Sequence, residues 1–342
     1  MPPPKSKSTR QALKPGSDVR FKDLSAVTAV SKSTIQSLWF NQDTVWAPNV
    51  APIAQNVLTA GMNPGLGVHL LHAQSITGAG VSVGIIDQNM LLGHPEYSSS
   101  VVQYCDFGCN QVEGSMHGPA VASLLVGKQI GTAPGAKLYF AAAPSWLEEA
   151  KFYADALNWL LAINAKLPPA EKIRVISVSA APSGPGSSFK DNKGKKMWDL
   201  GCASAEQKGV LVLDCTQTRW DIGRCYYDPD DPENLSKVTP GAPGEKLSEI
   251  SSRTLILAPS SRRTQAEEYQ PGKHSYQYTG IGGLSWSIPY IAGVLALGWQ
   301  VNPTLSGKEM MKLLGKAAFT QNGVRIINPP AFIASVQVST TP

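Results

Sequence analysis

The 342-residue chain has few charged residues, few cysteines and no apolar run long enough to cross a membrane. Charged residues make up 16% of the sequence and the net charge is only +5, whereas a dedicated nucleic-acid-binding protein concentrates lysine and arginine. The first residues, MPPPKSKS, lack the apolar core of a secretory signal. These absences argue against a nucleic-acid partner and against a membrane location, and they predict a cytoplasmic protein.

Residues that commonly bind metals are also scarce. The five cysteines form no CxxC pair and have no histidine at metal-ligand spacing, which favours free, mostly buried thiols. A Cys215–Cys225 bridge remains an alternative. Four carboxylates in one polar loop offer the hard oxygen atoms that calcium prefers: Asp228, Asp230, Asp231 and Glu233. Their spacing fits no EF-hand, so we expect no metal and no other cofactor, with calcium as the alternative.

Short β-branched and apolar runs alternate with longer helical patterns from about residue 66 onward. The runs predict strands that are buried on both faces, at 81–86, 137–142, 173–179, 210–213 and 254–258. Helices are expected at 117–127, 146–166, 197–208, 285–300 and 306–318. This alternation predicts an α/β fold: a doubly wound, mostly parallel sheet with helices on both faces and a ligand crevice at the carboxyl ends of the strands.

Composition divides the chain into an extension and one large domain. Residues 1–50 are rich in Pro, Ser, Thr and Lys and show weak periodicity, so we expect a basic, tail-like N-terminal extension. Residues 51–342 would form the main domain. Within it, residues 219–250 are polar and turn-rich, which predicts a long surface excursion.

Three residues have the chemistry and placement of a charge-relay site. Asp87 ends an apolar strand, where an unpaired buried carboxylate would be costly, so it needs a partner. His117 begins a predicted helix and is the best general-base candidate of the five histidines. Ser285 begins a long apolar helix after two glycines, where the helix dipole and backbone N–H groups favour a developing oxyanion. An isolated serine there would be only a helix cap.

The chain order aspartate, histidine, serine is the one found in subtilisin. Residues 78–87 (GAGVSVGIID), 117–122 (HGPAVA) with 131–138 (GTAPGAKL), and 283–293 (GLSWSIPYIAG) resemble the aspartate, histidine and serine segments of the subtilase family. The resemblance extends over about residues 66–320. Some positions depart from the family pattern: Leu284 and Trp286 stand where threonine and methionine usually flank the serine.

The resemblance implies an Asp87–His117–Ser285 triad. It also implies that Ser179, Ala180 and Ala181 line the substrate, which would bind as an extended strand. The position of the family's oxyanion-hole asparagine is taken by Gln217-Thr218, whose amide and hydroxyl are alternative donors. In subtilisin, loss of such a donor lowers turnover by about 10²–10³.

The sequence therefore predicts a serine endopeptidase that acts through an acyl-enzyme intermediate. We expect an intracellular processing peptidase of restricted specificity, with a peptide or protein substrate and no assigned oligomeric state. The alternative is a catalytically weak or silent protein of the same fold that binds peptides or partners. A nucleotide-binding protein is disfavoured because Gly78 and Gly80 precede a strand, whereas a dinucleotide loop follows one.

Overall fold

The computed structural model describes residues 13–109, 114–216, 220–246, 250 and 256–339. At its centre lies a five-stranded parallel sheet with strand order β5-β6-β4-β7-β8. Its strands are β4 (Ser82–Asp87), β5 (Val101–Asp106), β6 (Lys137–Ala142), β7 (Ile173–Val178) and β8 (Leu211–Asp214). Four of the five were predicted within two residues at each end, because their apolar runs are nearly continuous.

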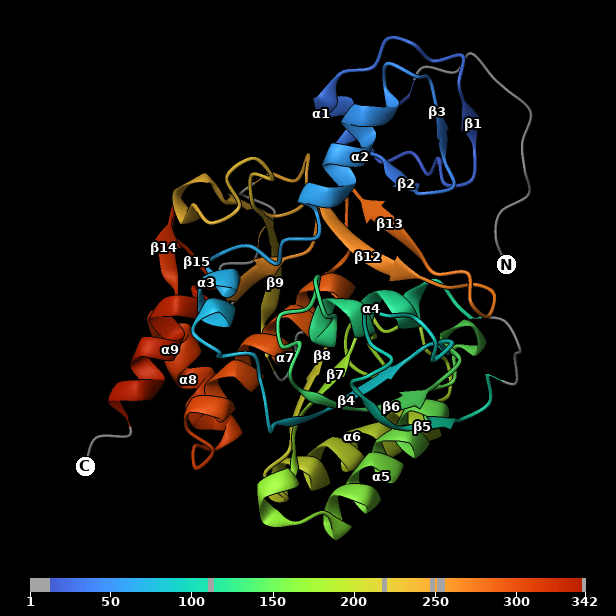
Figure 1. Cartoon of the computed structure of the whole chain (residues 1–342). Helices are drawn as coiled ribbons and strands as arrows, with labels where there is room; N and C mark the ends of the chain where they lie inside the picture. Colours follow the sequence, from blue (N-terminus) through green and yellow to red (C-terminus); the bar gives the residue numbers. More distant parts are fainter. Residues whose placement is uncertain (1–12, 110–113, 217–219, 247–249, 251–255, 340–342) are drawn as a thin grey trace.

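Helices cover both faces of this sheet (Figure 1). Alternate strand residues point to opposite sides, so Ile85 packs in a core with α4 (His117–Val126) and α7 (Leu284–Val301). Its neighbour Ile86 packs in a second core with α5 (Ala150–Lys166) and α6 (Asn192–Gln207). The predicted doubly wound α/β fold is confirmed.

A second five-stranded sheet lies beside the first, with strand order β10-β9-β11-β15-β14. Its strands are β9 (Ile222–Tyr226), β10 (Thr239–Pro240), β11 (Ile256–Pro259), β14 (Phe319–Gln321) and β15 (Val324–Ile326). The helices α3 (Val68–Ala73), α8 (Gly307–Ala317) and α9 (Pro329–Val338) complete this side of the molecule (Figure 1).

Strand β9 corrects the expectation of a surface excursion over residues 219–250. The strand pairs with β11 on one side and β10 on the other, and the side chains of Ile222, Cys225 and Tyr227 are fully buried. The polar residues that follow do form turns. The strand was missed because its three apolar or aromatic residues are interrupted by glycine and arginine, and its burial depends on β11, which comes 30 residues later in the chain.

The N-terminal region also differs from the expected tail. Over residues 13–60 the chain forms β1 (Asp23–Leu24), α1 (Lys32–Ile35), β2 (Trp39–Asn41), β3 (Val45–Trp46) and α2 (Ala51–Ala60). Strand β2 completes a three-stranded antiparallel sheet with β12 (Arg263–Glu267) and β13 (Ser275–Thr279). Figure 1 shows this region against β12 and β13. Its apolar residues lie on several short elements, so no periodicity reveals them.

Helix α7 is long and apolar enough to span a membrane, which the sequence analysis had not recognised. However, 78% of that helix is buried inside the protein, between the parallel sheet and its neighbours. The five cysteines, all within described residues, are free thiols, so Cys215 and Cys225 form no bridge.

Candidate active site

The carboxylate of Asp87 lies at the carboxyl end of β4 and is 2% exposed. Its Oδ1 atom accepts hydrogen bonds from the backbone N–H of Gln88 at 2.8 Å and from Nδ1 of His117 at 2.6 Å. This supplies the partner that the buried carboxylate requires. Because a carboxylate only accepts hydrogen bonds, Nδ1 carries a proton and Nε2 of the neutral ring is left as an acceptor.

His117 is the first residue of α4, and the residue after it explains how the helix reaches Asp87. A Cβ atom at Gly118 would lie 2.3 Å from the carbonyl oxygen of Gln88, so only glycine permits this approach. The His117 side chain is 18% exposed. Burial lowers its pKa, but the charge of Asp87 and the hydrogen bond to it outweigh burial, so the pKa is raised above its usual value.

Ser285 is the second residue of α7, after the N-cap Gly283. Its Oγ donates to the carbonyl oxygen of Ser179 at 3.3 Å, and Ser179 Oγ donates back to the carbonyl of Ser285 at 2.7 Å. Ser179 directly follows β7, so these two bonds attach the start of α7 to the carboxyl end of the parallel sheet. The N-terminal end of a helix favours negative charge, which suits a serine that forms an oxyanion beside it.

An aromatic contact connects the Asp87–His117 pair with the Ser179–Ser285 pair. The ring of Trp286, the neighbour of Ser285, stacks on the His117 ring with centroids 4.9 Å apart and planes inclined by 29°. The starts of α4 and α7 are therefore adjacent, and Asp87, His117, Ser285 and Ser179 gather at one edge of the sheet. These four residues were predicted from the sequence, whereas the contact of Trp286 with His117 was not; Trp286 was noted only as a departure from the family pattern.

The other predicted binding residues have mixed outcomes. Ala180 and Ala181 are partly exposed beyond β7, and the Ala180 carbonyl accepts the N–H of Cys215 at 2.9 Å, so one edge of this segment is already paired. That the segment binds substrate stays a prediction. Gln217 and Thr218 lie outside the described residues. A further polar contact was not foreseen: Gln88 Nε2 donates to Ser145 Oγ at 2.7 Å beside Asp87.

The carboxylates considered for calcium mostly bind protein groups. Asp230 pairs with Lys32 at 2.5 Å, Asp231 pairs with Lys237 at 2.8 Å, and Glu233 accepts hydrogen bonds from Asn63 and the backbone of Gly67. Among the described residues, no group of three or more His, Cys, Asp and Glu side chains is arranged to hold a metal ion. Calcium dependence stays untested.

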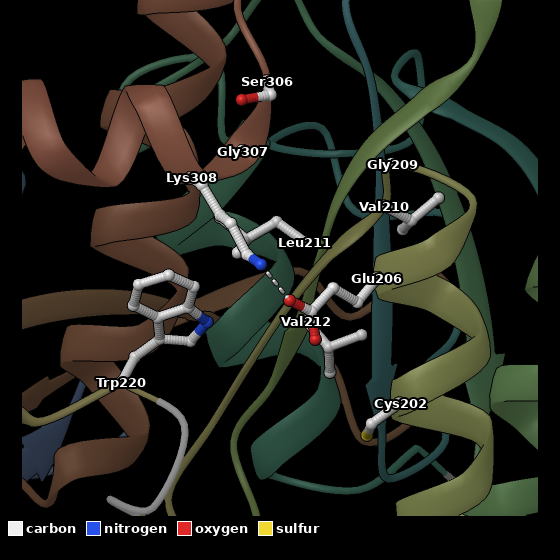
Figure 2. Close-up of a pocket in the computed structure, with 10 residues that line it drawn as sticks. All are labelled: Cys202, Glu206, Gly209, Val210, Leu211, Val212, Trp220, Ser306, Gly307 and Lys308. Atoms are coloured by element: carbon white, nitrogen blue, oxygen red, sulfur yellow. Dashed lines mark ion pairs between the residues drawn. The ribbon is translucent and has the colours of Figure 1, made fainter.

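A cavity of about 420 Å³ lies elsewhere, between α6, the first half of β8 and the start of α8 (Figure 2). Its walls include Val210, Val212 and Trp220, and an ion pair of 2.6 Å joins Lys308 to Glu206 across it. None of the predicted site residues that the structure describes lines it. It lies toward the amino-terminal end of β8, whereas ligands of such sheets bind at the carboxyl ends, so the edge that holds Asp87 and His117 is the better candidate site.

The chain is similar to known proteins in sequence and in fold. A sequence model described as "Subtilase family" matches residues 78–330. Among solved structures, the chain resembles fervidolysin from Fervidobacterium pennivorans, a keratinolytic enzyme related to subtilisin (16% identity, TM-score 0.57). The match covers 80% of this chain but only 45% of fervidolysin, so the chain spans less than half of that protein.

Two further structures are matched over nearly their whole length. Subtilase cytotoxin SubAB is similar at 15% identity and TM-score 0.59, with 81% of this chain and 96% of that chain covered. The nisin leader peptidase NisP from Lactococcus lactis is similar at 16% identity and TM-score 0.57, with coverages of 81% and 93%. At these identities the structures establish the fold, and the family match establishes the ancestry of the sequence.

Proposed function

This chain belongs to the subtilase family of serine peptidases, and we propose that it hydrolyses peptide bonds with Asp87, His117 and Ser285 as its catalytic triad. The observation that carries the proposal is the 2.6 Å hydrogen bond from His117 Nδ1 to buried Asp87, with Trp286 stacking the same imidazole beside Ser285. These residues come from three segments in the family's order, and the fold brings them to one edge of the sheet.

In the proposed reaction, His117 Nε2 takes the proton of the Ser285 hydroxyl as the oxygen attacks the carbonyl carbon of the scissile bond. Asp87 holds the ring in the required tautomer and stabilises the imidazolium. The imidazolium then gives its proton to the leaving amine, which leaves an acyl-enzyme on Ser285. Water, activated by the same histidine, releases the acid product and restores the serine.

The negative oxygen of the intermediate needs hydrogen-bond donors. The N-terminal end of α7 is one source of stabilisation, because the first backbone N–H groups of a helix have no partner within it. The side chains of Gln217 and Thr218 are part of the proposal as the second source. If neither the Gln217 amide nor the Thr218 hydroxyl reaches the oxyanion, turnover falls by about 10²–10³ relative to a site with that donor.

We further propose that the substrate is a peptide or protein segment bound in an extended form beside residues 179–181, with alanine at 180 and 181 leaving room for one of its side chains. NisP, a structural neighbour, is by its name a leader peptidase. By analogy, restricted cleavage of a precursor is the proposed role. The cytoplasmic location predicted from the sequence is part of the same proposal, and cell fractionation tests it.

The test compares wild type with Ser285→Ala and Ser287→Ala in a fluorophosphonate labelling assay and against a diverse peptide library read by mass spectrometry. Ser287 is a matched control because it lies two residues along the same helix, where its Oγ donates to the Ala258 carbonyl at 2.9 Å in the core. We expect labelling and cleavage by wild type and Ser287→Ala, and none by Ser285→Ala.

The second candidate function is peptide binding without catalysis. The hydrogen bond of the Ser285 hydroxyl to the Ser179 carbonyl favours it, because a nucleophile should donate to its base. Catalytic hydrogen bonds, however, often tighten only when substrate binds. A folded wild-type protein that is not labelled and cleaves no peptide, yet retains peptides on a column, would support this function and contradict the peptidase proposal.

A further inference from the structure

The contact between Trp286 and His117 carries an inference that rests on the proposed function and extends it. The two rings stack nearly face to face, with centroids 4.9 Å apart. Trp286 is 4% exposed, and its Nε1 atom has no hydrogen-bond partner among the described residues. Its contribution to the site therefore comes from the face of the indole ring and not from its N–H group.

The local chain is built to hold the indole in this place. Trp286 lies in the first turn of α7, and its backbone N–H donates to Gly283 at 3.2 Å. A Cβ atom at Gly282 would lie 2.4 Å from Cδ1 of Trp286, so the indole occupies the space that glycine leaves open. One ring edge of His117 is fixed by Asp87, and one ring face is covered by Trp286. Together these contacts restrict both the tilt and the rotation of the imidazole.

The electrostatics of the stack favour one protonation state of the histidine. A cation over the face of an aromatic ring within about 6 Å is attracted by the ring quadrupole, and tryptophan gives the strongest attraction. Neutral imidazole gains no such term. The stack therefore stabilises the imidazolium, which is the state that forms when the base accepts the serine proton.

The titratable groups near Asp87 could also change the charge beside His117. Asp87 on β4 interacts with His117, and the titratable side chains that interact with Asp87 in turn include Cys109, Tyr153 on α5 and Cys215 after β8. Burial raises the pKa of Cys109 to about 12 and raises the pKa values of Tyr153 and Cys215 further. These three groups are neutral while His117 titrates, so they add no charge beside Asp87, whose charge and hydrogen bond raise the pKa of His117.

We propose that Trp286 is a positioning residue for the general base: its indole face fixes the orientation of His117 toward Ser285 and stabilises the imidazolium formed during attack. In this step the Ser285 O–H bond breaks and a new N–H bond forms at His117 Nε2. The serine oxygen bonds to the substrate carbonyl carbon, and the π electron pair of the carbonyl moves to its oxygen, which becomes the oxyanion.

The decisive experiment replaces Trp286 by tetrafluorotryptophan in the full chain, through site-specific incorporation. Fluorination weakens the ring quadrupole while the shape of the indole is nearly kept, so burial and packing change little. The pKa of His117 is measured by NMR titration of its imidazole, with His117→Gln used to assign the signal. We expect the pKa to fall by about one unit, and the acid limb of the kcat/KM profile to move with it.

Two substitutions separate charge stabilisation from positioning. Trp286→Phe keeps a weaker π face, so its pKa shift should be smaller than that of the fluorinated ring and its kcat partly retained. Trp286→Leu removes the ring, and we expect kcat to fall at least about tenfold with little change in KM. If Trp286→Leu fails to fold, the fluorinated and phenylalanine variants still decide the question.

Trp299 provides the matched control, because it is equally buried on the same helix and its Nε1 donates to the Leu305 carbonyl, away from the site. Tetrafluorotryptophan at 299 should leave the His117 titration unchanged. An unchanged titration with the fluorinated ring at 286 would overturn the inference. Because NMR titration needs no turnover, it is separable from the proposed function: a shifted His117 pKa without any phosphonate labelling of wild type would contradict the peptidase proposal alone.

Discussion

The parallel sheet and the antiparallel sheet β12-β13-β2 both support the proposed active site, but they are built from different kinds of sequence. The parallel sheet holds Asp87 and Ser179 at the ends of largely apolar strands, and from β5 onward a helix lies between each strand and the next along the chain. The antiparallel sheet leads through Gly280–Gly283 into Ser285, and its third strand comes from residues 39–41.

The two sheets also differ in how they are held together. The parallel sheet is buried between two apolar cores. The antiparallel sheet has an apolar cluster that includes Phe40, but it also relies on buried polar groups. Arg20 and Trp39 both donate to Gln277 Oε1, and Asn41 donates to Glu267 at 2.7 Å. The residue that follows β13 also bonds directly to the N-terminal region: the N–H of Gly280 donates to the Leu38 carbonyl at 2.8 Å. Ser285, the proposed nucleophile, therefore follows a sheet whose contacts include directional hydrogen bonds, which a single substitution can remove.

The largest effect is expected at the link between the antiparallel sheet and α7. A Cβ atom at Gly282 would lie 1.9 Å from the carbonyl oxygen of Ser260, so Gly282→Ala must move backbone three residues before Ser285. We expect the rate of phosphonate labelling to fall by at least about 10²-fold. Gly283→Ala is the matched control, since its Cβ would meet nothing closer than 3.9 Å. Equal labelling of the two variants would contradict this account.

The same substitution in each sheet should separate their roles. Phe140 on β6 and Phe40 on β2 are both buried, so Phe140→Ala and Phe40→Ala should each lower the free energy of unfolding by about 3–5 kcal/mol. Urea denaturation measures the total loss of unfolding free energy, and hydrogen exchange shows which strands lose protection. We expect Phe40→Ala to lose protection mainly in β2 and β13, and Phe140→Ala throughout the parallel sheet. The same pattern of lost protection in both variants would show that the sheets unfold as one unit.

The buried carboxyl of Glu267 should make the antiparallel sheet sensitive to pH. Burial raises its pKa to about 7, although Asn41 and Arg20 lower it. Between about pH 4.5 and 7 the unfolded chain loses this proton while the folded protein keeps it, so stability falls as pH rises, by about 3 kcal/mol in total. Glu267→Gln should remove this slope and be the more stable protein at pH 8.

Urea denaturation of wild type and Glu267→Gln at several pH values provides the measurement. Glu171→Gln is a suitable control, because the Glu171 side chain is half-exposed and lies beside the parallel sheet, where it pairs with Lys137. If the unfolding free energies of wild type and Glu267→Gln changed with pH in the same way, the Glu267 carboxyl would not be the cause of the pH dependence.

The smallest effect is expected outside both sheets, at the start of α8. Ser306 and Glu309 form a capping box there, so Ser306→Ala should lower the free energy of unfolding by about 1 kcal/mol. It should leave phosphonate labelling and the exchange pattern of both sheets unchanged. Reduced labelling of Ser306→Ala would mean that labelling follows overall stability, whichever part of the protein is destabilised.

The comparison also explains what the sequence revealed. Asp87, His117 and Ser285 were recognisable because each stands at the boundary of a continuous apolar strand or helix, and such patterns are local. The contributions of Phe40 and Ile222 were not recognisable, because their strands are short and are buried by partners distant in the sequence. Trp286 was visible as a departure from the family pattern, but only the folded chain shows that it lies on the histidine.

The pairing of β2 with β13 also has a consequence for biosynthesis. Trp39 and Gln277, joined by a hydrogen bond, are 238 positions apart in the chain. At about 5–20 residues per second, a ribosome needs roughly 10–50 seconds to bring the second strand to the first. During that time Asp87 and His117 have been synthesised, whereas Ser285 has not. Until synthesis reaches residue 285, a nascent chain therefore holds the proposed base without the proposed nucleophile.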